Sequence, residues 1–181
     1  MKNLLKFISI FILFNSIFAS LLSAEESFIP KPPSLNATNY ILIDSVSGRV
    51  LAENGSDERI EPASITKVMT GFVAADQIAK GFVSLEDEVL ISENCWRKGG
   101  SKMFIREGTR VLFSDLMKGM VIQSGNDASC AIAEHVAISE EGFVELMQLY
   151  VKELGMENTQ FKNVSGWPDP CLLYTSDAAD D

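Results

Sequence analysis

The sequence has 181 residues, of which 46% are hydrophobic and 22% charged, and its formal net charge is -10 at pH 7. This composition is typical of one ordinary globular domain, and the acidic balance, with no basic stripe beyond the extreme N-terminus, argues against a nucleic-acid interface. A single histidine, His135, and three widely spaced cysteines do not supply a zinc ligand set, so we expect neither a metal nor a cofactor.

Residues 1–24 have the features of an export signal. Lys2 and Lys6 give a positively charged start, residues 7–22 form a mostly apolar run, and small residues precede a cleavage point after Ala24. We therefore expect a protein secreted across the inner membrane into the periplasm. An uncleaved membrane anchor is the alternative.

Two short β-prone runs follow an extended, proline-containing lead-in at residues 25–38. Residues 40–44 and 49–53 are joined by a Ser-Val-Ser-Gly turn whose glycine, Gly48, suits a positive backbone angle φ. The pattern predicts an N-terminal β-hairpin in a domain that begins near Asn39.

Helical periodicity dominates the rest of the chain. Apolar residues recur at the spacing of one buried helix face in a segment that we expect to begin at Ser64: Ile65, Val68, Met69, Phe72 and Val73. Further on, the patterns predict a short strand at 88–91 and helices at 114–123, 127–137 and 140–154, with a break at 124–126.

The three cysteines, Cys95, Cys130 and Cys171, are odd in number although the expected compartment permits disulfides. Cys130 lies among alanines and a serine, which is typical of a small buried thiol. We therefore expect free cysteines. A bridge between Cys95 and Cys130 is the alternative.

Ser64 and Lys67 share one edge of the expected helix, within about 60° of each other. A serine hydroxyl becomes a nucleophile when a base takes its proton, and a lysine can be that base when burial and positive potential keep it neutral. The unpaired N–H groups at a helix start supply this potential and favour negative charge on an attacked carbonyl oxygen. By itself, the pair equally fits a solvated lysine after an N-cap serine.

Ser124, Gly125 and Asn126 lie in the predicted break between two helices. There, a hydroxyl could relay a proton to a leaving amine, and a carboxamide could hold the lysine and bind a substrate carbonyl. Taken alone, Ser-Gly-Asn is an ordinary turn composition, so it gains meaning only in combination with Ser64 and Lys67.

In combination, these segments resemble the secreted D-alanyl-D-alanine carboxypeptidases, the low-molecular-weight penicillin-binding proteins of bacteria. The likeness covers residues 39–170, the N-terminal portion of a serine D,D-peptidase domain. It rests on the hairpin and on four motifs: Pro-Ala-Ser-Ile-Thr-Lys at 62–67, Gly-Gly-Ser-Lys-Met-Phe at 99–104, Gln-Ser-Gly-Asn-Asp-Ala at 123–128 and Gly-Met-x-Asn-Thr-x-Phe at 155–161. The implied fold is of the α/β class, α+β in type and β-lactamase/transpeptidase-like, with helices packed on an antiparallel sheet of which only the N-terminal hairpin is present.

The resemblance also implies an activity, which is removal of the terminal D-alanine from peptidoglycan stem peptides ending in D-Ala-D-Ala, and acylation by β-lactam antibiotics. It makes Ser64 the acylated nucleophile and Lys67 the general base. Ser124 becomes a proton relay, and Asn126 orients the lysine and the substrate. An association with the membrane surface, through a C-terminal segment missing from this sequence, is left open.

The sequence departs from the family pattern at its end. Such enzymes carry a Lys-Thr-Gly strand that grips the substrate carboxylate and supplies an oxyanion donor, and no such motif occurs between Asn126 and Asp181. Residues 171–181 also differ from the usual continuation. We therefore expect a C-terminally truncated chain with a non-native tail and no activity of its own.

Two other functions stay open alongside the carboxypeptidase and a related endopeptidase. A class A β-lactamase is disfavoured because Ser-Asp-Asn is usual there in place of Ser124-Gly125-Asn126, and because a Glu-x-x-Leu-Asn segment is missing near residue 160. A non-catalytic protein that binds peptidoglycan or another partner on the same scaffold would fit the missing Lys-Thr-Gly region.

Overall fold

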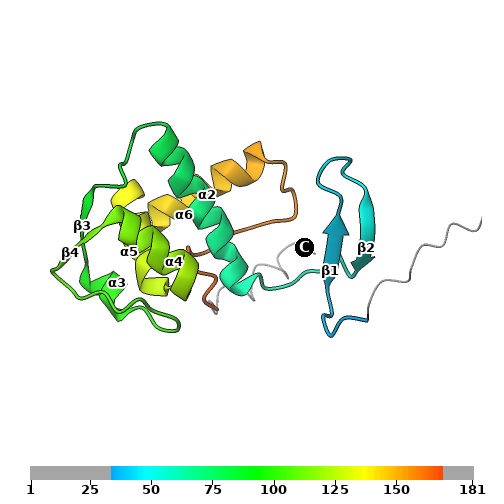
Figure 1. The fold of residues 1–181 in the computed structure, drawn as a ribbon, viewed down its shortest axis with the longest axis horizontal. Helices are drawn as coiled ribbons and strands as arrows, with labels where there is room; N and C mark the ends of the chain where they lie inside the picture. The colour runs from blue at the N-terminus through cyan, green and yellow to red at the C-terminus, as the bar shows by residue number, and fades with distance from the viewer. Residues whose placement is uncertain (1–33, 169–181) are drawn as a thin grey trace, which may run out of the picture. The chain divides into compact units, whose positions relative to one another are not determined.

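The computed structural model describes residues 34–168. The predicted export signal, most of the lead-in and the predicted tail lie outside these residues. The described residues divide into two compact units between Glu58 and Arg59 (Figure 1).

The first unit is the predicted hairpin, which is confirmed. Strands β1 (Tyr40–Ile43) and β2 (Val50–Asn54) pair antiparallel, with Tyr40 opposite Asn54. In the connecting turn, Asp44 Oδ1 accepts hydrogen bonds from the backbone N–H and hydroxyl of Ser47, and Gly48 has φ of +71°. The carboxylate and the glycine therefore shape the turn, as expected for residues that satisfy or tolerate unusual backbone geometry.

The second unit is a group of helices with a small strand pair, in the following chain order: η1 (Ala63–Ile65), α2 (Thr66–Ala79), β3 (Glu88–Leu90), α3 (Glu93–Arg97), β4 (Arg110–Leu112), α4 (Phe113–Gln123), α5 (Asn126–Ala137) and α6 (Glu140–Glu153). Helix α5 packs against α2, α3, α4 and α6. Its residues from Asn126 to Ala133 are all buried, and most are small, so neighbouring helices can approach it closely. Asn126, a residue of the predicted site, begins this buried helix, so the packing of α5 fixes the position of the Asn126 backbone.

Several boundaries differ from the sequence predictions. Ser64 lies in the short 3₁₀ turn η1, and the α-helix begins two residues later, at Thr66. Helix α3 and strand β4 were not predicted, and β4 pairs antiparallel with β3 in a sheet separate from the hairpin. Runs this short give weak periodic signals, so their formation depends on what they pack against.

Cys95 and Cys130 form a disulfide with their Cα atoms 5.2 Å apart, so the expectation of free thiols is wrong for this pair. The error follows from the unpredicted helix α3, which brings Cys95 against α5, where both cysteines are fully buried. The bridge spans a sequence separation of 35 residues, and the loop-entropy relation assigns it about 4 kcal/mol of stabilisation. Cys171 lies outside the described residues.

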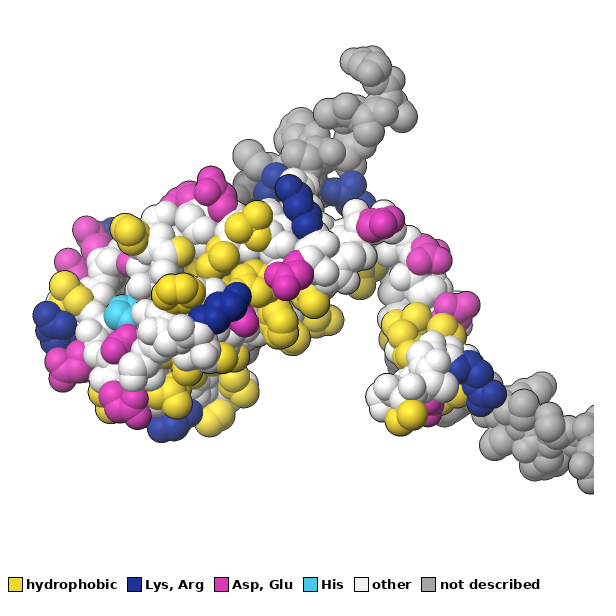
Figure 2. All heavy atoms as spheres, turned by 90° about the horizontal axis from the view of Figure 1, so that it is seen from above, with side chains coloured by type: hydrophobic (Ala, Val, Ile, Leu, Met, Phe, Trp, Pro, Cys, Tyr) yellow, Lys and Arg dark blue, Asp and Glu magenta, His cyan; other side chains and the backbone are white. Residues whose placement is uncertain are grey.

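Large apolar side chains also reach the surface of the helical unit. Val68 on α2 and Val121 and Ile122 on α4 are each more than 70% exposed, and Figure 2 shows hydrophobic side chains gathered on the visible face of this unit. Within the helical unit, no other part of residues 59–168 covers them. None of the described helices is both long and apolar enough to cross a membrane.

Candidate active site

Ser64 and Lys67 meet at the start of α2. The Lys67 Nζ atom lies 3.2 Å from Ser64 Oγ, within hydrogen-bond distance. The 3₁₀ turn exposes Ser64, whereas Lys67, on the first turn of the α-helix, is only 7% exposed. The structure thus brings the predicted pair together as an accessible hydroxyl beside a buried amine.

A second hydrogen bond fixes the Lys67 side chain. Its Nζ atom donates to the backbone carbonyl of Ser165, 2.9 Å away, and one turn later Thr70 Oγ1 donates to the carbonyl of Val164 at 2.7 Å. Burial lowers the pKa of Lys67 from its ordinary value, because removing an ammonium group from water disfavours its charged form. A neutral amine can donate to the Ser165 carbonyl and still direct its lone pair at Ser64.

The segment from Asn163 to Trp167 was missed by the sequence analysis. Asn163 Oδ1 accepts hydrogen bonds from the backbone N–H groups of Ser165 and Gly166, which closes a tight turn. Gly166 has φ of +73°, and a Cβ atom on it would lie 1.7 Å from the carbonyl oxygen of Ala63. The Asn-Val-Ser-Gly composition was the available turn signal, but nothing local connects it with Lys67.

Asn126 lies at the first turn of α5 and is 6% exposed. Its side-chain Nδ2 donates to the carbonyl of Gly99 at 2.8 Å, and its backbone N–H donates to the carbonyl of Ser101 at 2.7 Å. Gly100 has φ of +76°, and a Cβ atom on it would lie 2.7 Å from Asn126 Nδ2. The loop that contains the Gly-Gly-Ser-Lys-Met-Phe motif therefore holds the Asn126 amide.

Ser124 ends α4 in a left-handed conformation, with φ of 52°, and is half-buried. This places it in a break between α4 and α5, as predicted. Its hydroxyl makes no hydrogen bond to the part of the chain that the structure describes. Its assignment as a proton relay stays a prediction.

A cavity of about 530 Å³ adjoins this group of residues. Asn126, Gly99, Ser165 and Trp167 line one part of it, and the half-buried ion pair between Lys98 and Glu140, with 2.5 Å between Nζ and Oε2, lines another. Ser165 thus faces the cavity while its carbonyl holds Lys67. The cavity offers polar and charged partners next to Asn126 and Ser165, whereas Ser64 and Lys67 are not among its lining residues.

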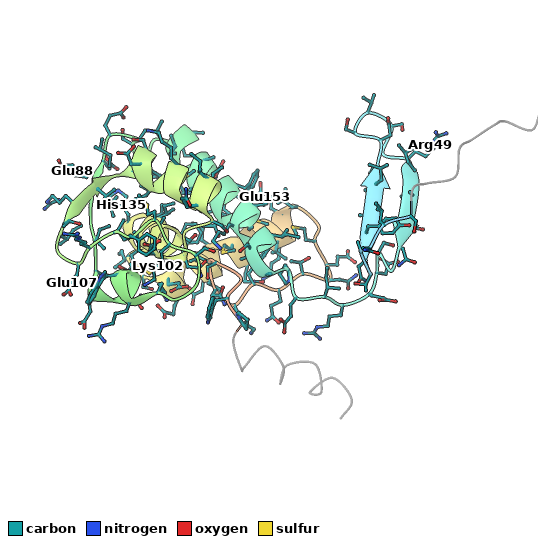
Figure 3. The ribbon with its side chains drawn as sticks, turned by 60° about the horizontal axis from the view of Figure 1, so that its bottom comes forward. Arg49, Glu88, Lys102, Glu107, His135 and Glu153 are labelled. Atoms are coloured by element: carbon teal, nitrogen blue, oxygen red, sulfur yellow. A yellow bond between two sulfur atoms is a disulfide. The ribbon has the colours of Figure 1, made fainter. Side chains whose placement is uncertain are left out.

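His135 contacts residues outside the candidate active site. Its Nε2 lies 3.0 Å from Asp87 Oδ2, and its ring packs near Phe113. Figure 3 labels His135 within the helical unit. The sulfurs of Cys95 and Cys130 lie close to the Glu134 carboxylate, but disulfide sulfurs are not the thiolates that bind metals. Neither cluster therefore offers a metal site among residues 34–168.

Comparison with known proteins gives a consistent set of relatives. Residues 26–180 match the Peptidase_S11 family, described as D-alanyl-D-alanine carboxypeptidase. The chain is 40% identical over 166 residues to the D-alanyl-D-alanine carboxypeptidase DacC of Escherichia coli (strain K12), an alignment that covers 88% of this chain and 41% of that protein. It is 43% identical over 147 residues to DacA of the same organism, covering 78% of this chain and 36% of DacA.

Solved structures with a similar fold include a carboxypeptidase and a penicillin-binding protein. The D-alanyl-D-alanine carboxypeptidase DacD from Francisella tularensis aligns with a TM-score of 0.76 and 36% identity, covering 83% of this chain and 37% of that one. Penicillin binding protein 5 from Haemophilus influenzae aligns with a TM-score of 0.75 and 38% identity, covering 79% and 42% of the two chains. The chain therefore spans about two fifths of the length of these relatives.

Proposed function

The chain belongs to the D-alanyl-D-alanine carboxypeptidase family, Peptidase_S11, and from this premise we propose that Ser64 is the nucleophile with which its protein hydrolyses D-Ala-D-Ala stem peptides. One observation carries the assignment: the exposed Ser64 hydroxyl lies 3.2 Å from the buried Lys67 amine. Because the chain spans two fifths of its relatives, the experiments below concern the complete gene product that contains these residues.

In the proposed reaction, neutral Lys67 takes the Ser64 proton while Ser64 Oγ bonds to the carbonyl carbon of the penultimate D-alanine. The carbon–nitrogen bond to the terminal D-alanine then breaks, and the proton passes from Lys67 to the leaving amine. Water afterwards hydrolyses the ester on Ser64, which releases the shortened peptide. The 3.2 Å separation supports the first proton transfer, since it lies within hydrogen-bond reach.

Ser124 and Asn126 take supporting roles in this proposal. The Ser124 hydroxyl relays the proton from Lys67 to the leaving amine, and the Asn126 amide orients Lys67 and binds the substrate carbonyl. The support for Asn126 is its rigid position beside the cavity that Ser165 also lines. The support for Ser124 is its place in the short break before α5.

A β-lactam presents a strained amide to the same nucleophile, so we include acylation by β-lactams and an extracytoplasmic location in the proposal. The relative from Haemophilus influenzae is named a penicillin binding protein. Peptidoglycan is built outside the inner membrane, which agrees with the export signal expected at residues 1–24.

The first prediction is that penicillin forms a stable adduct on Ser64 of the complete protein. Intact-protein mass spectrometry should show one added penicillin mass, and digestion should place it on the peptide that contains Ser64. Ser64→Ala should gain no mass, while Ser92→Ala, which removes a helix-capping hydroxyl elsewhere, should be labelled normally. Labelling of Ser64→Ala would contradict the assignment, and rapid release of hydrolysed penicillin would favour a β-lactamase.

The second prediction concerns pH. Because burial lowers the pKa of Lys67, the amine loses its proton at a lower pH than an exposed lysine does, and only the neutral form can accept the Ser64 proton. The acylation rate should therefore rise with pH through this lowered pKa and level off above it. Stopped-flow acylation over a pH series would check this, and a rate that stays flat from mildly acidic to alkaline pH would contradict a neutral lysine base.

A further inference from the structure

Asp127, the residue after Asn126, is a fully buried carboxylate that makes no ion pair with any residue in the described range. Its Oδ1 accepts from the backbone N–H of Met103 at 3.0 Å, and its Oδ2 accepts from those of Phe104 at 2.9 Å and Ile105 at 3.2 Å. Oδ1 also accepts from the N–H of Ala128, 2.9 Å away in its own helix. Three consecutive amides of a distant loop thus converge on one side chain.

These hydrogen bonds offset the cost of burying the carboxylate. A buried charge without a counter-ion requires several oriented donors, and here they come from the loop and from the first turn of α5, where backbone N–H groups favour an anion. The loop also contains a strained residue, because Phe104 has φ of 65° and is 80% exposed. Since its side chain gains little burial, the bonds to Asp127 account for how the backbone keeps this left-handed conformation.

The same loop holds Asn126 from the other side. The carbonyl of Gly99 accepts from Asn126 Nδ2, and the carbonyl of Ser101 accepts from the Asn126 backbone N–H. Asp127 therefore accepts hydrogen bonds from the end of the loop, and the beginning of the loop accepts a hydrogen bond from the Asn126 side chain. The contacts form a closed ring across the first turn of α5.

We propose that Asp127 is a positioning residue for the reaction: it fixes residues 99–105, and through them it sets the orientation of the Asn126 amide. The inference rests on the proposed function, since it assumes that Asn126 contacts Lys67 or the substrate. In this proposal, Asp127 makes no contact with the substrate. Its effect on the reaction should therefore pass entirely through Asn126.

Asp127→Asn is the direct test in the complete protein. The amide replaces one acceptor oxygen with an NH₂ group, which faces backbone N–H donors and cannot accept their hydrogen bonds. The loop and the Asn126 amide should shift, and misplacement of a catalytic group by about 1 Å can cost about 100-fold in rate. We expect the penicillin acylation rate at saturating penicillin to fall about 10- to 100-fold.

The measurement that separates positioning from general stability is a double-mutant cycle with Asn126→Ala. If Asp127 acts through Asn126, adding Asp127→Asn to Asn126→Ala should lower the acylation rate by less than about twofold. An equal loss in both backgrounds, or no loss in the parent, would overturn the proposal. A parent protein that penicillin does not label would instead refute the proposed function.

Two controls match the Asp127→Asn variant. Asp115→Asn changes an exposed carboxylate in the first turn of α4 and should leave the acylation rate unchanged. Met147→Ala empties a buried site on α6 away from the loop, in the apolar cluster that also contains Val164, so it should lower the unfolding temperature while slowing acylation far less than Asp127→Asn does. A loss of acylation in Met147→Ala equal to that in Asp127→Asn would mean that stability alone explains the effect.

If Asp127→Asn does not fold, Gly100→Ala tests the same loop without altering the carboxylate. The new Cβ would lie 2.4 Å from Trp167 Cζ3 and 2.7 Å from Asn126 Nδ2. In a Trp167→Ala background, which removes the first of these contacts, Gly100→Ala should slow acylation at least about tenfold with Asn126 present and less than about twofold with alanine there. For Asp127 itself, hydrogen exchange of the unaltered protein should show slow exchange of the Met103, Phe104 and Ile105 amides. Fast exchange of all three, or an equal Gly100→Ala loss in both backgrounds, would overturn the proposal.

Discussion

Lys67→Ala is expected to slow acylation of Ser64 by penicillin about 100- to 10,000-fold, the usual contribution of a positioned general base. The Lys67 amine lies 3.2 Å from Ser64 Oγ, and a hydroxyl without a base beside it remains protonated and weakly nucleophilic. The variant should still fold, since the substitution removes a buried amine whose charged form burial disfavours. Stopped-flow measurement of adduct formation, with thermal unfolding in parallel, checks both statements.

Two further variants sharpen this test. Lys80→Ala removes a half-exposed lysine at the other end of α2, where it pairs with Asp76 at 2.6 Å, and should leave the acylation rate unchanged. Lys67→Arg keeps a positive charge but cannot become a neutral base, so it should be nearly as slow as Lys67→Ala. An arginine variant that reacts at the parent rate would show that charge, and not proton acceptance, is what the site requires.

Gly166→Ala is expected to destabilise the protein by about 2 to 5 kcal/mol. The left-handed φ of +73° costs an alanine about 1 to 2 kcal/mol, and forcing an extra atom into a packed site costs about 1 to 3 kcal/mol more. The clash is with backbone, because the new Cβ would lie 1.7 Å from the Ala63 carbonyl oxygen and 2.8 Å from Thr66 Oγ1. Chemical denaturation of the variant and parent would measure the difference in unfolding free energy.

Gly155→Ala is the matched control. Gly155 also has a positive φ, +67°, but a Cβ atom there would meet nothing within 4 Å. Gly155→Ala should therefore lower the free energy of unfolding only by the backbone cost of about 1 to 2 kcal/mol. Gly166→Ala should also slow acylation, because the strained turn contains the Ser165 carbonyl that holds Lys67. Equal destabilisation by the two substitutions would contradict the close packing of Gly166 against Ala63.

The sequence by itself determined the features that depend on neighbours along the chain. The hairpin follows from two β-prone runs and a glycine turn, and helix α2 follows from apolar spacing. Helices α4, α5 and α6 follow from capping, break and stop signals, and each of the four helices begins within two residues of its predicted start. The proximity of Ser64 and Lys67 was also predictable, because three residues of helical backbone bring such side chains together. In each case the required geometry is local.

Only the tertiary structure decided the surroundings of this pair. The carbonyl that holds Lys67 lies 98 residues further along the chain, the partner of Cys95 lies 35 residues away, and Asp127 binds amides 22 to 24 residues before it. The periodicity of the sequence does not predict such contacts, because they form only when the helices pack their buried faces together. A buried carboxylate or amine is stable only after that packing supplies its hydrogen-bond partners, so its role is set by the whole fold.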